Sequence, residues 1–208
     1  MRAGLAAGRN AARDLCLFEL GISTGFRIRE LLSLRLRDVV QAGRVVDVLL
    51  VRKRSMKGGR KRGKSGNLLS GVRSRSVPLV RDVRLLISQQ VEALRGRGYM
   101  REIDFVFQDS RFRNRAITPN AAWKILHAAA RRQGITGKIG THSMRKTFAL
   151  RLYEWLQNNR RPDGGAYDAL RIVSKALGHE SIDTTLRYLA FDDKWIADAV
   201  FGAFGSVT

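Results

Sequence analysis

A short β-branched stretch inside an otherwise helical pattern is the feature that most restricts the fold of this chain. Residues 38–51, DVVQAGRVVDVLLV, place valine and leucine on both sides of an Ala42-Gly43 turn, which predicts a β-hairpin. The segment RSRSVPLV at 73–80 predicts a third strand that pairs with this hairpin. Because apolar residues elsewhere recur at helical spacing, we expect a mainly α fold with a small antiparallel β-sheet, an α+β class.

Local start and stop signals divide the remaining sequence into helices. Asn10, Thr118 and Thr141 are residue types that begin helices, whereas Gly25 and Gly178 are of the type that ends them. The pattern predicts helices over 10–22, from Arg27 through Leu32, over 82–96, 119–133, 142–157 and 166–177, from Ser181 toward Tyr188, and over 193–204. A chain of 208 residues with 44% hydrophobic content can bury one substantial core, so we expect a single domain over residues 1–208.

The charge balance points to a polyanionic partner. The chain carries 39 Lys and Arg against 18 Asp and Glu, a formal net charge of +21, and nucleic acid is the polyanion that best fits such a domain. No apolar stretch reaches membrane-spanning length and the N-terminus lacks a signal-peptide pattern, so we expect a soluble, cytoplasmic protein without a membrane partner. The single cysteine, Cys16, excludes an internal disulfide and a zinc cluster, and it fits a core position.

Residues 48–81 concentrate this charge. They contain eleven Lys or Arg residues, five glycines and no acidic residue, which fits either a solvated basic loop or a strand-loop-strand device that follows phosphates. A lysine in such a device can donate a proton, which arginine cannot. Lys57 is the first candidate and Lys64 the second. The cations expected to contact DNA are Arg52, Lys53, Arg54, Arg60, Lys61, Arg62, Lys64, Arg73, Arg75 and Lys146.

Two motifs near the C-terminus carry the remaining chemistry. THSMRKT at 141–147 places His142 and Arg145 three residues apart in the first turns of a helix, where amide groups favour an anion. ALGHESIDTTLRY at 176–188 supplies His179 and Tyr188. Each residue alone has an ordinary structural explanation, such as a packed aromatic ring for a tyrosine. Together with Arg27 they form a set suited to metal-free phosphoryl transfer, because cations hold a phosphate while a phenol attacks it.

In this order and spacing, the chain resembles the catalytic domain of the tyrosine recombinase (phage integrase) family. The matching segments are TGFRIRELLSLRLRDV at 24–39, RSRSVPL at 73–79, THSMRKTFA at 141–149 and ALGHESIDTTLRY at 176–188. The resemblance implies a site-specific enzyme of DNA recombination and integration, as found in mobile elements, that needs no cofactor or metal. It also implies double-stranded DNA and a DNA-bound homo-oligomer, a tetrameric synapse, as partners, with an accessory protein in some systems and a prokaryotic, nucleoid-associated location.

The same resemblance assigns a role to each candidate. Arg27 and Arg145 would clamp the scissile phosphate, with Glu30 supporting Arg27. His142 and His179 would complete the acid–base set. Lys57 would protonate the leaving 5′ oxygen, and Tyr188 would form a 3′-phosphotyrosyl bond. The helix and tail at 193–208 would dock on a neighbouring protomer, or pack on their own domain.

Two departures and two alternatives accompany this interpretation. Only about 26 residues precede Arg27, so we expect the N-terminal core-binding domain of typical members to be absent. The hairpin between 57 and 74 is also longer and richer in glycine than usual.

A type IB topoisomerase-like strand transferase would use nearly the same chemistry. A non-enzymatic DNA-binding module would also explain the charge, and it predicts that no covalent adduct forms.

Overall fold

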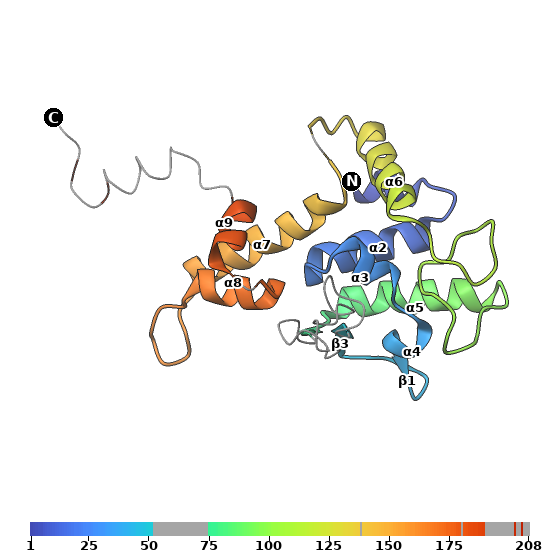
Figure 1. The fold of residues 1–208 in the computed structure, drawn as a ribbon, viewed down its shortest axis with the longest axis horizontal. Coiled ribbons are helices and arrows are strands. Elements are labelled where there is room, and N and C mark those ends of the chain that lie inside the picture. Colours follow the sequence, from blue (N-terminus) through green and yellow to red (C-terminus); the bar gives the residue numbers. More distant parts are fainter. Residues whose placement is uncertain (52–74, 138, 180, 190–201, 203–204, 206–208) are drawn as a thin grey trace, which may run out of the picture. The chain divides into compact units, whose positions relative to one another are not determined.

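The computed structural model describes residues 1–51, 75–137, 139–179, 181–189, 202 and 205 (Figure 1). The chain divides into two compact units, Met1–Phe148 and Ala149–Thr208, and each is described by itself. The elements of the first are α1 (Arg2–Ala6), α2 (Ala11–Thr24), α3 (Ile28–Leu32), α4 (Leu36–Val39), β1 (Val40–Gln41), β2 (Arg44–Val45), β3 (Val48–Val51), β4 (Arg75–Pro78), α5 (Arg81–Arg95) and α6 (Pro119–Arg132). Helix α7 (Thr141–Asn158) begins in the first unit and ends in the second, which also holds α8 (Ala169–Leu177) and α9 (Ile182–Leu189). The expected fold class, mainly helical with small antiparallel sheets, is confirmed.

Helix α2 forms the centre of the first unit. It packs against α1, α3 and α5, and α6 packs against α1 and α3. Its inward side chains Cys16, Leu17 and Leu20 have no exposed surface, and burial raises the pKa of the Cys16 thiol to about 12. This confirms the expected core position of the cysteine. The helix therefore supplies a rigid base from which the following turn emerges.

The turn after α2 depends on a glycine. Gly25 adopts a left-handed conformation with φ of 62°, and its N–H donates to the Gly21 carbonyl at 3.1 Å. An added Cβ at this position would lie 2.4 Å from a ring carbon of Phe148. The end of α2 at Gly25 was predicted from the sequence, and the turn allows α3 to begin three residues later with Arg27 as its N-cap.

The strands form two separate ladders rather than one three-stranded sheet. Strands β1 and β2 pair through Val40–Val45 and Gln41–Arg44, and the predicted turn between them has positive φ at both Ala42 and Gly43. Strand β3 does not join this hairpin but pairs antiparallel with β4, from Val48–Pro78 to Val51–Arg75. The strand expected from RSRSVPLV is β4, and its partner β3 lies within the stretch 38–51, as predicted. The difference is that this stretch divides into β2 and β3, so that two ladders form in place of one.

The helix caps beyond β4 are mostly those expected. The Thr118 hydroxyl accepts a hydrogen bond from the Ala121 N–H at 3.1 Å at the start of α6. Gly178 ends α8 in a left-handed conformation. Helix α8 begins at Ala169 rather than at 166, because the Asp168 carboxylate accepts the Arg171 N–H and caps the helix there. The helix expected over 193–204 lies outside the described residues, and the single-domain organisation stays a prediction.

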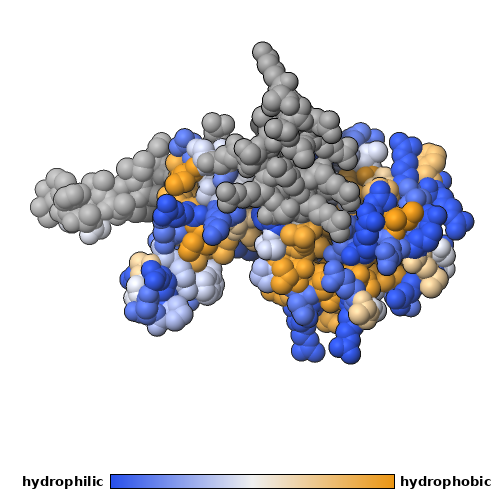
Figure 2. Space-filling view, turned by 60° about the horizontal axis from the view of Figure 1, so that its bottom comes forward, coloured by the Kyte–Doolittle hydropathy of each residue, from blue (hydrophilic) through white to orange (hydrophobic). Residues whose placement is uncertain are grey.

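The surface combines charged side chains with exposed apolar ones. Figure 2 shows hydrophobic residues in orange among protruding hydrophilic residues in blue on one face of the molecule. Exposed apolar side chains of the first unit include Val48, Leu50, Val80 and Leu85. Among the described helices, not one combines the length and the apolar character needed to cross a membrane.

Candidate active site

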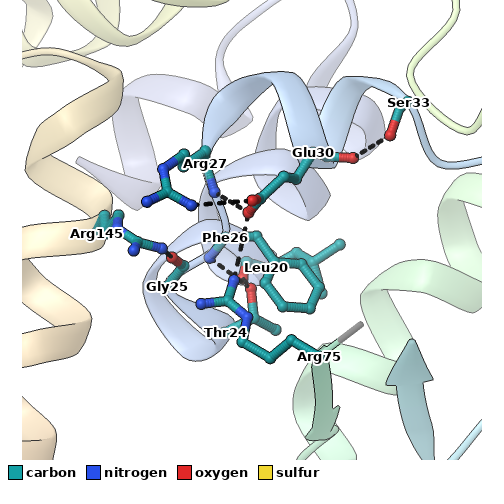
Figure 3. A network of polar contacts seen from close by, with 9 residues as sticks. All are labelled: Leu20, Thr24, Gly25, Phe26, Arg27, Glu30, Ser33, Arg75 and Arg145. Atoms are coloured by element: carbon teal, nitrogen blue, oxygen red, sulfur yellow. Dashed lines mark hydrogen bonds and ion pairs between the residues drawn. The ribbon is translucent and has the colours of Figure 1, made fainter. Parts of the chain in front are cut away.

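An ion pair between Arg27 and Glu30 lies at the centre of the candidate site. The Arg27 N–H donates to Glu30 Oε2 at 2.6 Å, and the Arg27 guanidinium contacts Glu30 Oε1 at 3.2 Å (Figure 3). The Glu30 carboxylate is almost completely buried, whereas the Arg27 side chain is about one-third exposed. One carboxylate thus caps the start of α3 and holds the arginine next to it, while leaving part of the guanidinium open to solvent. These contacts agree with the position next to the first arginine that the resemblance implies for Glu30, whose supporting role in catalysis stays a prediction.

Arg145 reaches the same turn from helix α7. Its side chain is only 1% exposed, and its Nη1 donates a hydrogen bond to the Gly25 carbonyl oxygen. Figure 3 shows the guanidiniums of Arg27 and Arg145 on the same side of this turn. The structure therefore brings together two arginines that are separated by 118 residues in the sequence. Both residues lie in the first unit.

Arg75 occupies a different position from the one the sequence suggested. We expected it among the cations that contact DNA, but the residue is only 7% exposed at the start of β4. Its Nη2 lies 3.3 Å from Glu30 Oε2, and its guanidinium carbon lies 4.5 Å from the centre of the Phe26 ring. Burial lowers the pKa of Arg75 to about 10; Glu30 opposes this shift, whereas the charges of Arg145 and Arg27 add to it. The expectation of a surface contact is corrected, because strand β4 turns this side chain inward.

His142 and Lys146 lie on the exposed side of α7. His142 is in the first turn of the helix, as predicted, and both side chains are exposed. The three-residue spacing places His142 near Arg145 along the helix, but the arginine points inward to Gly25. The start of α7 thus contributes one buried cation and two accessible ionisable groups.

The second unit contains His179 and Tyr188. His179 follows the left-handed Gly178 cap, and its N–H donates to the Ser174 carbonyl at 3.0 Å. Its Nδ1 lies 2.9 Å from the hydroxyl of Thr185, which is fully buried. The sequence reasoning missed Thr185 because its contact depends on how α8 and α9 pack together. Tyr188 belongs to α9.

The remaining predicted residues lie outside the described part of the chain. They are Lys57 and its alternative Lys64, together with Arg52, Lys53, Arg54, Arg60, Lys61, Arg62 and Arg73. Their assigned roles stay predictions. In the described ranges, no group of three or more His, Cys, Asp and Glu residues is placed to hold a metal ion.

The described cluster is suited to holding an anion. The charges of Arg27 and Arg145 both act on Arg75, and the buried Glu30 carboxylate forms ion pairs with Arg27 and Arg75. Positive charge is therefore in excess among these four residues. Guanidinium groups match the planar, two-oxygen face of a phosphate.

Comparison with known proteins identifies the family. The phage integrase family profile matches residues 3–194, and the chain belongs to this family. One similar protein is "Tyrosine recombinase XerD" of Mycobacterium tuberculosis (strain CDC 1551 / Oshkosh), which is 33% identical over 182 residues, covering 85% of this chain and 47% of that protein. Another is "Tyrosine recombinase XerC" of Myxococcus xanthus, at 29% identity over 180 residues, with 85% and 49% covered. The chain spans about half the length of these relatives.

Solved structures support the fold. The XerH site-specific recombinase in a post-cleavage complex with a palindromic difH substrate aligns with a TM-score of 0.66 and 23% identity, over 96% of this chain and 49% of that one. The XerA recombinase aligns with a TM-score of 0.64 and 18% identity, over 97% and 61% of the two chains. At these identities the comparison establishes a shared fold.

Proposed function

We propose that this chain is the catalytic part of a site-specific DNA recombinase that cuts and rejoins DNA through a 3′-phosphotyrosyl intermediate. The observation that carries the proposal is the pair of arginines, Arg27 and Arg145, which meet at the Gly25 turn beside one buried carboxylate. Membership of the phage integrase family supports the same activity. A covalent enzyme–DNA bond conserves the energy of the broken phosphodiester, so rejoining needs neither ATP nor a metal.

In this mechanism the phosphate is held by cations and attacked by a phenol. Arg27 and Arg145 stabilise the charge that develops on the non-bridging oxygens in the transition state. Stabilisation of this kind by fixed donors is usually the largest contribution to the rate enhancement. Tyr188 attacks the phosphorus and forms the 3′-phosphotyrosyl bond, and its phenolic proton passes to the acid–base set that His142 and His179 complete. The bond to the 5′ oxygen breaks, and this oxygen leaves with a proton from Lys57. The hydrogen bond between His179 and Thr185 supports this role, since it orients the imidazole ring.

The proposed partners follow from the family and from the charge. Double-stranded DNA is the substrate, in agreement with the net charge of +21 and with relatives whose structures are complexes with DNA. Two sites recombine within a tetrameric synapse, for which residues 193–208 provide contacts between protomers, with an accessory protein where the system uses one. We place this activity in the prokaryotic cytoplasm at the nucleoid.

The decisive experiment traps the covalent intermediate. The protein is incubated with nicked suicide DNA substrates drawn from the flanks of its own gene, so that the short product diffuses away after cleavage. We expect a protein–DNA adduct that survives denaturation and is sensitive to protease. DNA binding without any adduct would support a non-enzymatic DNA-binding module instead. Relaxation of supercoiled DNA without exchange between two sites would favour a topoisomerase-like activity.

The lysine assignment has its own test. A 5′-bridging phosphorothiolate replaces the leaving oxygen by sulfur, which departs without needing a proton. We expect Lys57→Ala to be inactive on ordinary DNA and largely restored on this substrate, measured as the rate of adduct formation. Lys64→Ala serves as the matched control in the same basic segment, and restoration of that variant in place of Lys57→Ala would transfer the role to Lys64.

A further inference from the structure

Arg75 is a buried cation to which the sequence assigned the wrong environment. It is the first residue of β4 and pairs in register with Val51 of β3. Buried and exposed side chains alternate along β4, and Arg75 falls on the buried face together with Val77. The ladder between β3 and β4 therefore fixes the direction in which this guanidinium points.

Two contacts connect Arg75 to the segment that carries Arg27. Its Nη2 is 3.3 Å from Glu30 Oε2, and its guanidinium lies over the ring of Phe26, which has no exposed surface (Figure 3). Glu30 Oε2 is also the atom that accepts the Arg27 N–H at 2.6 Å. A single carboxylate oxygen is thus shared between Arg75 and the backbone of Arg27.

The Gly25–Arg27 turn is consequently held from two directions. Arg145 donates to the carbonyl of Gly25, while Arg75 contacts the neighbouring ring of Phe26 and the carboxylate of Glu30. If Arg75 is removed, the buried carboxylate loses one of the two cations that contact it within the described part of the chain. We expect the Arg27 guanidinium then to turn further toward Glu30, an orientation that is less suited to meeting a phosphate.

Packing alone gives no reason for a cation at position 75. An apolar side chain would fill the space beside Phe26 without the cost of burying charge, and that cost is visible in the lowered pKa of Arg75. A planar guanidinium, by contrast, can stack on the Phe26 ring and contact the Glu30 carboxylate at the same time. The geometry therefore favours a role in orientation.

We propose that Arg75 is a positioning residue that holds Glu30 and the Gly25–Arg27 turn, and so aims Arg27 at the scissile phosphate. This inference rests on the proposed function. It differs from the contact with DNA that the sequence suggested, because Arg75 acts through Glu30 and Arg27 and does not touch the substrate.

The test compares Arg75→Met and Arg75→Lys with wild type in single-turnover cleavage of the suicide substrate at saturating DNA. We expect the cleavage rate of Arg75→Met to fall about 10- to 100-fold, as for other residues that orient a catalytic group, with DNA affinity changed less than about twofold because one cation among many contributes little. Arg75→Lys keeps the positive charge but loses the planar guanidinium, so its cleavage rate should lie between those of wild type and Arg75→Met.

Arg13→Met is the matched control for loss of a buried arginine. Arg13 is also 7% exposed, lies in the same unit, and pairs with Asp14 and the Gln108 carbonyl away from the candidate site. Thermal unfolding identifies the temperature at which all variants are folded. At that temperature Arg13→Met should cleave at the wild-type rate, so that a loss confined to Arg75 variants cannot come from lower stability.

A double-mutant cycle shows whether Arg75 acts through Arg27. On top of Arg27→Ala, the change Arg75→Met should reduce the cleavage rate by less than about twofold, since residues in one network are not additive. Independent, multiplicative losses would overturn the inference, as would equal losses of DNA affinity and cleavage, which would make Arg75 a DNA contact. An unchanged rate in Arg75→Met with an active wild type would refute this inference alone, whereas an inactive wild type would refute the proposed function and the inference with it.

Discussion

Tyr188→Phe is expected to abolish the covalent protein–DNA adduct completely while leaving DNA binding at the wild-type level. The substitution removes one hydroxyl, which is the proposed nucleophile, and keeps the arginine cluster that holds the phosphate. Adduct formation is measured on suicide substrates after denaturation, and DNA affinity by titration at fixed salt, because the affinity of so basic a chain changes steeply with salt.

Tyr167→Phe provides the control for this result. Tyr167 lies in the same unit, where its ring contacts Trp155, so the substitution removes a tyrosine hydroxyl from the same region. We expect this variant to form the adduct at the wild-type rate. An adduct formed by Tyr188→Phe would eliminate Tyr188 as the nucleophile, and sequencing of the DNA-linked peptide would then identify the residue that replaces it.

Arg27→Ala should reduce the cleavage rate by several orders of magnitude with only a small loss of DNA affinity. A donor aimed at charge that develops in the transition state contributes roughly 3–4 kcal/mol, whereas a single phosphate contact among many alters affinity little. The Glu30 carboxylate keeps its contact with Arg75 in this variant, so the buried charge retains a cation. The measurement is single-turnover cleavage beside a binding titration on the same DNA.

Arg29→Ala is the control for Arg27→Ala, because Arg29 is an exposed arginine on the same short helix, α3. It should leave the cleavage rate nearly unchanged. Equal losses of binding and cleavage in Arg27→Ala would make this residue a positioning contact for DNA rather than a catalytic one. The variant Arg145→Ala is expected to lose as much cleavage activity as Arg27→Ala. It also removes the donor to the Gly25 carbonyl, so its effect on the free energy of unfolding must be measured first.

Most helix ends could be predicted from the sequence, whereas the division of the strands into ladders could not. Gly25 and Thr118 ended and began helices as expected, since a left-handed cap and a hydroxyl cap are local signals. The pairing of the RSRSVPLV strand with the stretch 38–51 was also predicted, but the division of that stretch between two ladders was not. The predicted start of α8 was wrong, because Asp168 caps the helix and the sequence reasoning overlooked this cap.

The candidate site could likewise be predicted only in part. The resemblance implied that Glu30 supports Arg27, and the two residues, which are three apart in the sequence, are in contact. The burial of Arg75 and the partner of His179 could not, because each depends on which face of an element turns inward. Composition made Arg75 look like the other cations between residues 48 and 81. The β3–β4 register places Arg75 on the buried face of β4.

The conformation of Gly25 limits how this part of the chain can vary. A side chain at this position meets two separate obstacles, a φ of 62° that L-residues rarely adopt and the ring of Phe148 at 2.4 Å. A smaller residue at position 148 would remove the second obstacle but not the first. A side chain at Gly25 therefore requires a change of the backbone as well as of the Phe148 ring. The helix that begins after Arg27 thus depends on a turn that only glycine adopts without strain.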